Sequence, residues 1–211
     1  MAFVGSMPKD YRSGPVEEEV FRYWESSKIP EKLRARKVGK KFYFLDGPPY
    51  VTNPIHVGTA WNKTLKDAYI RYLRMNGYIV RDQPGFDMHG LPIEVMVEKK
   101  IGIKSKKDIE VMGIEKFISV CKSFAIENLK VATTQFKNLG VWMDWEAPYR
   151  TLDNDYIESV WWLISRAEEK KLLGKGKKIV HWCPRCETVL AGYEATDEYR
   201  DVEEESIYVK F

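Results

Sequence analysis

Hydrophobic and polar positions along the chain follow two periods, one typical of strands and one typical of helices. The predicted strands span 41–45, 78–83 and 206–211, and the predicted helices span 17–25, 56–76 with a stop at Gly77, 115–139 and 153–174. The aromatic run 42–45 predicts that the first strand is buried. Strand–helix–strand–helix order predicts an α/β fold with a Rossmann-like parallel sheet and right-handed crossover helices.

A turn rich in glycine and proline follows the first predicted strand. Gly47, Pro48 and Pro49 end the strand, and the next helix opens with His56-x-Gly58. The free N–H groups and the positive dipole end of a helix N-terminus favour a bound phosphate. Gly58 carries no side chain that would block a nucleotide. The alternative is that the prolines only stiffen a loop and that His56 is a helix cap.

A second polar turn follows the second predicted strand. It contains Asp87 and His89, and Pro92 marks the start of a further helix. Ligands of parallel sheets bind at the carboxyl ends of the strands, so we expect both turns to face one crevice. Asp87 would then bind an ammonium group. Taken singly, each polar residue here is better explained as an ordinary turn residue, and only the shared crevice favours binding.

The three cysteines divide into one single residue and one close pair. Cys121 falls on the apolar side of a predicted helix and is expected to be a core residue. Cys183 and Cys186, separated by Pro-Arg, have the spacing of half a zinc knuckle. A redox pair is the alternative, and His181 is a candidate third ligand. A second ligand pair beyond Phe211 would also complete the site.

Composition limits the classes of function only broadly. The 211 residues include 34 basic and 31 acidic side chains, and the net charge of +3 is too small to indicate nucleic-acid binding. Seven Trp and twelve Tyr predict a large aromatic core. The chain has no apolar run of membrane-spanning length and no signal peptide, so we expect a cytoplasmic protein without a membrane partner. Three cysteines fit a reducing compartment.

The two turns together resemble a known family. Residues 46–49 and 56–59, Asp-Gly-Pro-Pro and His-Val-Gly-Thr, are similar to the nucleotide signature of class I aminoacyl-tRNA synthetases. Residues 85–94, Gly-Phe-Asp-Met-His-Gly-Leu-Pro-Ile-Glu, resemble the isoleucyl branch. Thr59 stands where the family usually has a second histidine, a departure associated with archaeal-like members. The resemblance covers the chain from about Tyr11 onward.

The resemblance implies an activity and a set of site residues. The expected reaction joins isoleucine to ATP with Mg²⁺, and the isoleucyl group is then passed to tRNA(Ile); no DNA partner is expected. Catalytic roles fall on His56, Gly58 and Thr59. ATP binding falls on Pro49, Asn53, His56, Gly58 and Thr59. Amino-acid binding falls on Gly47, Pro48, Asp87 and His89. The implied Zn²⁺ ligands are Cys183 and Cys186.

The resemblance also implies a domain organisation. Residues 1–40 form an N-terminal helical segment, 41–173 form the first half of a catalytic domain, and 174–211 begin a connective insertion. The Lys-Met-Ser-Lys-Ser loop, the editing domain and the anticodon-binding helices are absent from these 211 residues. Two alternatives stay open at this point: a small self-contained nucleotidyltransferase, and a non-catalytic zinc module that binds tRNA or another synthetase.

Overall fold

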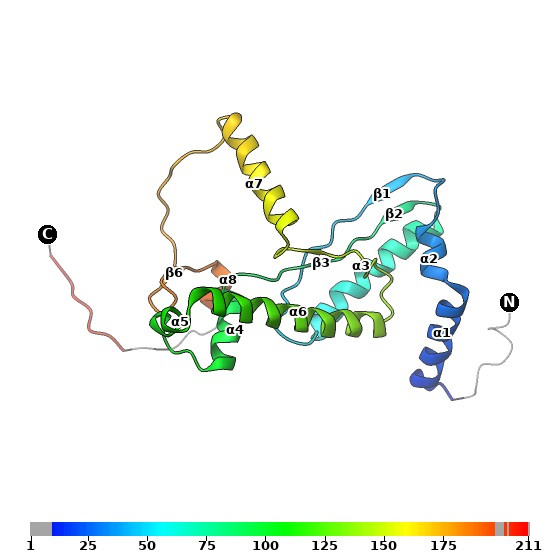
Figure 1. The fold of residues 1–211 in the computed structure, drawn as a ribbon, viewed down its shortest axis with the longest axis horizontal. Helices are drawn as coiled ribbons and strands as arrows, with labels where there is room; N and C mark the ends of the chain where they lie inside the picture. Colours follow the sequence, from blue (N-terminus) through cyan, green and yellow to red (C-terminus); the bar gives the residue numbers. More distant parts are fainter. Residues whose placement is uncertain (1–9, 197–200, 202, 211) are drawn as a thin grey trace.

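Parallel strand pairs joined by helices form the centre of the molecule (Figure 1). A computed structural model describes residues 10–196, 201 and 203–210. The helices are α1 (Ser13–Ser27), α2 (Ile29–Arg34), α3 (Val57–Met75), α4 (Leu91–Ile101), α5 (Lys106–Met112), α6 (Ile114–Asn138), α7 (Asn154–Glu169) and α8 (Gly192–Thr196). The strands are β1 (Lys41–Tyr43), β2 (Ile79–Arg81), β3 (Gly85–Phe86), β4 (Tyr149–Arg150), β5 (Trp182–Cys183) and β6 (Thr188–Val189).

The predicted parallel arrangement is confirmed. β1 pairs in parallel with β2, and β3 pairs in parallel with β4. A further parallel contact joins the segments that follow β1 and β3. The Asp87 N–H donates to the Pro49 carbonyl at 2.9 Å, and a parallel bridge joins Tyr50 to Asp87. Helix α3 connects β1 to β2, and α4, α5 and α6 lie between β3 and β4 in the chain.

The long helices lie close to their predicted positions, α4 begins beside the predicted Pro92, and the short helices α2, α5 and α8 were not predicted. α7 ends at Glu169, before the predicted stop at Gly174. α5 carries a capping box in which Ser105 and Asp108 satisfy each other's backbone N–H groups, a signal that is readable in the sequence. Figure 1 shows α7 extending away from the sheet.

Burial differs from the prediction in β1 and α3. Tyr43 is 70% exposed and Leu45 is 81% exposed, so the first strand is not buried on both faces as expected. Of the five apolar residues that mark α3 in the sequence, Leu73 is buried and the other four are exposed: Trp61, Leu65, Tyr69 and Tyr72. Nothing in the described part of the chain covers these faces. The aromatic core is therefore smaller than composition predicts.

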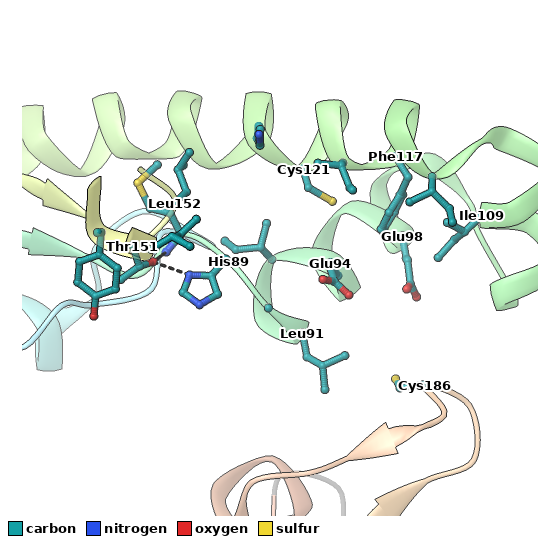
Figure 2. A pocket seen from close by; sticks show the side chains of 18 of the residues that line it. His89, Leu91, Glu94, Glu98, Ile109, Phe117, Cys121, Thr151, Leu152 and Cys186 are labelled. Carbon is teal, nitrogen blue, oxygen red and sulfur yellow. Dashed lines mark hydrogen bonds between the residues drawn. The ribbon is translucent and has the colours of Figure 1, made fainter. Parts of the chain in front are cut away.

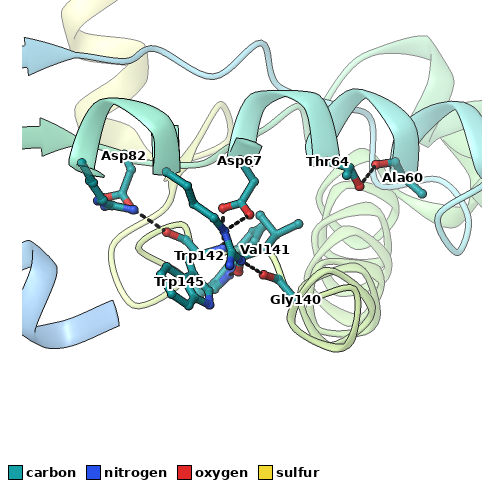
Figure 3. A network of polar contacts seen from close by, with 10 residues as sticks. Ala60, Thr64, Asp67, Asp82, Gly140, Val141, Trp142 and Trp145 are labelled. Atoms are coloured by element: carbon teal, nitrogen blue, oxygen red, sulfur yellow. Dashed lines mark hydrogen bonds and ion pairs between the residues drawn. The ribbon is translucent and has the colours of Figure 1, made fainter. Parts of the chain in front are cut away.

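The buried face of α3 carries charges that are paired. Asp67 accepts a hydrogen bond from the Arg71 Nε at 2.6 Å and another from the Trp142 N–H at 2.7 Å. Arg74 is 2% exposed and donates to the Asp82 carboxylate at 2.6 Å. Figure 3 shows this network between α3 and the segment 140–145. A buried charge is tolerated only when it is paired in this way, which explains why the polar face points inward.

Two apolar clusters complete the core. One lies between β3, α4 and α6, and the other lies between α3, β2 and the segment after α6. The first contains Val51, Phe86, Met88, Ile93, Val97, Phe117, Ala125, Ala132 and Phe136. The second contains Ile70, Leu73, Val80, Val141 and Met143. Trp145 packs against both clusters, and its ring stacks on Phe136 with centroids 5.5 Å apart.

The C-terminal part is built from small elements. β5 and β6 form an antiparallel hairpin. The strand predicted over 206–211 is not present at residues 206–210, and Phe211 lies outside the described residues. Hydrogen bonds to a neighbouring strand would be needed to hold such a segment extended in a sheet. None of the described helices has the length and apolar character that a bilayer crossing requires.

Candidate functional site

Asp46 lies at the end of the first strand and connects it to the rest of the site. Its carboxylate is buried and accepts from the ammonium groups of Lys63 and Lys66, the second at 2.8 Å. The Gly85 N–H donates to the same carboxylate at 3.1 Å, and the Tyr149 hydroxyl donates to the Asp46 carbonyl. Asp46 therefore holds the end of the first strand against α3, β3 and β4.

The ring of Tyr149 explains the glycine at position 85. A Cβ added to Gly85 would overlap this ring. Burial and the nearby Asp46 raise the pKa of Tyr149 to about 12, so its phenol keeps its proton and remains a donor. Burial lowers the pKa of Lys63, against the opposing attraction of Asp46.

His56 is the N-cap of α3. Its Nδ1 accepts from the Gly58 N–H at 3.1 Å, and its Nε2 lies 3.0 Å from the Thr59 hydroxyl. An accepting Nδ1 carries no proton, so the neutral ring carries it on Nε2 and donates to Thr59. A Cβ on Gly58 would lie 3.0 Å from the His56 ring. The space above Gly58 is thus occupied by His56 itself.

Four of the predicted ATP-binding residues line one cavity. Pro49, Asn53, His56 and Thr59 surround a volume of about 290 Å³, whose inner wall includes the ring of Phe136. The loop between strand and helix is anchored from behind, because the Gln135 side chain of α6 accepts from the Ile55 N–H at 2.9 Å. A helix N-terminus, an imidazole and a hydroxyl at one opening suit an anionic ligand.

The second turn is organised by a residue that the sequence did not reveal. The hydroxyl of Thr151 lies 2.6 Å from the His89 Nδ1 and 3.1 Å from an oxygen of Asp87. Thr151 is 4% exposed and follows β4, the third parallel strand. The signal was available, since a polar residue at the end of a third parallel strand belongs at the same sheet edge as the other two turns.

The two turns are adjacent in backbone but border different cavities. Val51 N–H donates to the Asp87 carbonyl at 3.3 Å, which places the turns side by side. His89 and Thr151, however, line a larger cavity of about 660 Å³ between α4, α5, α6 and α7, whose lining does not include His56 (Figure 2). Among the described cavities none contains both histidines, so the common crevice stays a prediction.

The remaining predicted amino-acid residues occupy the first turn. Gly47 is exposed, and its added Cβ would meet only the Lys66 ammonium at 3.9 Å. Pro48 is half-buried. Neither residue lines a described cavity, and the structure does not bring either of them into one cavity with Asp87.

Cys183 is the last residue of β5, and Cys186 lies in the turn between β5 and β6. The Cys186 N–H donates to the Cys183 sulfur at 3.4 Å, and this hydrogen bond lowers the pKa of the Cys183 thiol. Arg185 forms an ion pair with Glu98 at 2.7 Å, which holds the turn against α4. Within the described residues no third His, Cys, Asp or Glu joins the pair, so these ligands alone do not complete a tetrahedral zinc site.

Parallel strands, polar turns at their carboxyl ends and a helix N-terminus opening with His-x-Gly are typical of the class of α/β proteins that bind nucleotides. A family model described as tRNA synthetases class I (I, L, M and V) matches residues 19–210, and the chain belongs to this family.

Isoleucine–tRNA ligases of archaea are similar to the chain over most of its length. The enzyme of Pyrococcus furiosus is 56% identical over 205 residues, which are 96% of this chain and 19% of that protein. The enzyme of Sulfolobus acidocaldarius is 57% identical over 199 residues, 92% of this chain and 19% of that protein. The chain thus spans about a fifth of the length of these relatives.

A solved structure has the same fold. The LeuRS of Agrobacterium radiobacter K84, in a ternary complex with tRNA and LeuAMS, superimposes with a TM-score of 0.62 at 24% identity. The match covers 88% of this chain and 21% of that one.

Proposed function

We propose that the chain is the N-terminal portion of an isoleucine–tRNA ligase and carries part of the site that activates isoleucine with ATP. The observation that carries the proposal is the cavity beside the α3 N-terminus, which His56 and Thr59 line in a chain of this family. Transfer of isoleucine to tRNA(Ile) belongs to the longer protein.

In the proposed reaction a carboxylate oxygen of isoleucine attacks the α-phosphorus of ATP in line, and pyrophosphate leaves. The negative charge that must be stabilised sits on phosphate oxygens, so positioned donors contribute more than proton transfer. His56 would turn its Nε2–H from Thr59 to a phosphate oxygen, and the freed Thr59 hydroxyl would donate to the same group. Mg²⁺ would arrive with ATP and neutralise the phosphates.

The amino-acid end of the site would lie at the second turn. Asp87 would accept from the isoleucine ammonium, because one of its oxygens is not engaged by Thr151. Gly47 and Pro48 would form the adjoining backbone and apolar wall. A zinc ion at Cys183 and Cys186 would need ligands from outside the described residues and takes no part in this reaction.

Binding of a non-hydrolysable isoleucyl-adenylate analogue tests the proposal. Removing the charge with Asp87→Asn should weaken binding about 10- to 100-fold, because a hydrogen bond to a charged group contributes about 1.5–3 kcal/mol. Asp155→Asn, an exposed position at the start of α7, is the matched control and should bind like the parent. Isothermal titration measures both.

ATP–pyrophosphate exchange provides the catalytic test. Exchange by the chain, or by the longer protein that contains it, should depend on isoleucine. Equal exchange with an unrelated carboxylate would instead indicate a different nucleotidyltransferase. Unchanged analogue binding after Asp87→Asn would remove Asp87 from the site.

A further inference from the structure

Thr151 holds the two polar side chains of the second turn through one oxygen atom. The Met88 N–H donates to the Thr151 hydroxyl at 2.9 Å. The Asp87 Oδ1 and the His89 Nδ1 lie 3.1 Å and 2.6 Å from the same oxygen. Figure 2 shows the His89 ring pointing toward Thr151 from across the turn.

The number of protons available fixes the direction of each bond. A hydroxyl has one proton to donate and two lone pairs that accept. The Met88 N–H can only donate and the Asp87 carboxylate can only accept, so the hydroxyl proton is directed to Asp87. His89 must therefore donate from Nδ1, which leaves the lone pair of the neutral ring on Nε2.

We propose that Thr151 is a positioning residue of the amino-acid site, which fixes the His89 proton on Nδ1 and presents two acceptors to a ligand ammonium. The acceptors are His89 Nε2 and Asp87 Oδ2, and neither has a partner in the described part of the chain. An α-amino acid supplies such an ammonium, with three N–H donors. The inference rests on the proposed function.

The first turn, which contains His56, supplies an internal reference. His56 accepts from the Gly58 N–H through Nδ1, so its proton lies on Nε2, the opposite nitrogen from His89. The chain contains three histidines in all, which makes each ring resolvable in one spectrum. The tautomers can therefore be read without any activity measurement.

Nitrogen-15 NMR of histidine-labelled protein tests the proton positions. We expect His89 protonated on Nδ1 and His56 protonated on Nε2 near neutral pH. Thr151→Val, which keeps the shape and removes the hydroxyl, should return His89 to the ordinary Nε2–H form. Thr151→Ser should keep the Nδ1–H form. A parent spectrum with His89 protonated on Nε2 overturns the proposal, even if the valine variant does not fold.

Affinity for the isoleucyl-adenylate analogue tests the consequence. Thr151→Val should bind about tenfold more weakly and Thr151→Ser within about threefold of the parent. Equal binding by Thr151→Val, with its tautomer changed, would show that Thr151 does not position the site. If the parent binds no analogue, the proposed function fails for this chain, and the NMR result still decides the proton positions.

Discussion

At the scale of single residues, the three cysteines have different surroundings and should differ in reactivity. Burial and the carboxylates of Glu94 and Glu98 raise the pKa of Cys121 to about 11. Backbone N–H groups lower the pKa of Cys183. The thiolate is the reactive form, so a thiol with a lowered pKa reacts sooner when both are accessible.

Iodoacetamide at pH 8 should modify Cys183 at least about tenfold faster than Cys121, since a pKa near 11 leaves little thiolate there. Peptide mass spectrometry over time measures both rates. Added Zn²⁺ should slow Cys183 and Cys186 together if they bind the ion as a pair, and Cys121 should not respond. Equal rates at Cys121 and Cys183 would contradict the assigned environments.

Site residues differ in how far the sequence reveals them. His56 and Asp87 were predicted as site residues because each follows a strand and lies in a turn with glycine or proline. Tyr149 and Thr151 were not, because their roles depend on which strands become neighbours. Gly58 was predicted as a site residue because it leaves room for a nucleotide. The structure adds a second reason, since the His56 ring lies directly over Gly58.

At the scale of elements, the contact between the first strand and α3 depends on a buried ion pair. Asp46 forms ion pairs with both Lys63 and Lys66, and the Lys63 ammonium also lies 5.2 Å from the Phe136 ring centroid. Removing the carboxylate leaves two cations without their partner. Removing Lys63 leaves Asp46 still paired with Lys66, in a site walled by aromatic rings.

Asp46→Ala should lower the free energy of unfolding by about 3–5 kcal/mol, the usual cost of leaving a buried charge unpaired. Lys63→Met should cost only about 1 kcal/mol, because Asp46 keeps Lys66 as its partner and no buried charge is left unpaired. Lys137→Met, which breaks an exposed pair with Glu146, is the control and should be nearly silent. Urea unfolding measures all three; equal losses at positions 46 and 63 would contradict the argument.

At the scale of the whole molecule, the free energy of unfolding at alkaline pH should depend on the hydrogen bond from the Tyr149 hydroxyl to the Asp46 carbonyl. The folded pKa of about 12 lies above the ordinary value of 10.0, so the folded state holds the phenol proton more tightly. This contribution is complete below pH 10 and is lost as the pH rises toward 12. Lys63 acts in the opposite direction, since its lowered pKa makes stability rise with pH.

Tyr149→Phe should therefore show a smaller fall in unfolding free energy between pH 9 and pH 11 than the parent. The difference between the two proteins isolates Tyr149, because Lys63 is present in both. Denaturant unfolding at the two pH values provides the measurement. Parallel pH curves for parent and variant would show that the phenol does not titrate differently in the folded state.

The sequence alone determined the order of the main elements, the parallel direction of the strands and the places of the two turns. Those features depend on local periodicity, on turn residues and on the right-handed crossover that a strand–helix–strand unit requires. These features can be predicted without knowing what each element packs against. The archaeal-like isoleucyl resemblance also came from contiguous motifs.

Only the tertiary structure decided which faces are buried and which side chains meet. α3 buries three paired charges beside Ile70 and Leu73, and it exposes most of the apolar residues that its pattern placed inside. Tyr149 reaches Asp46 across 103 positions, and Thr151 reaches His89 across 62. Such contacts form between segments that are far apart in the chain, so a local sequence pattern cannot predict them.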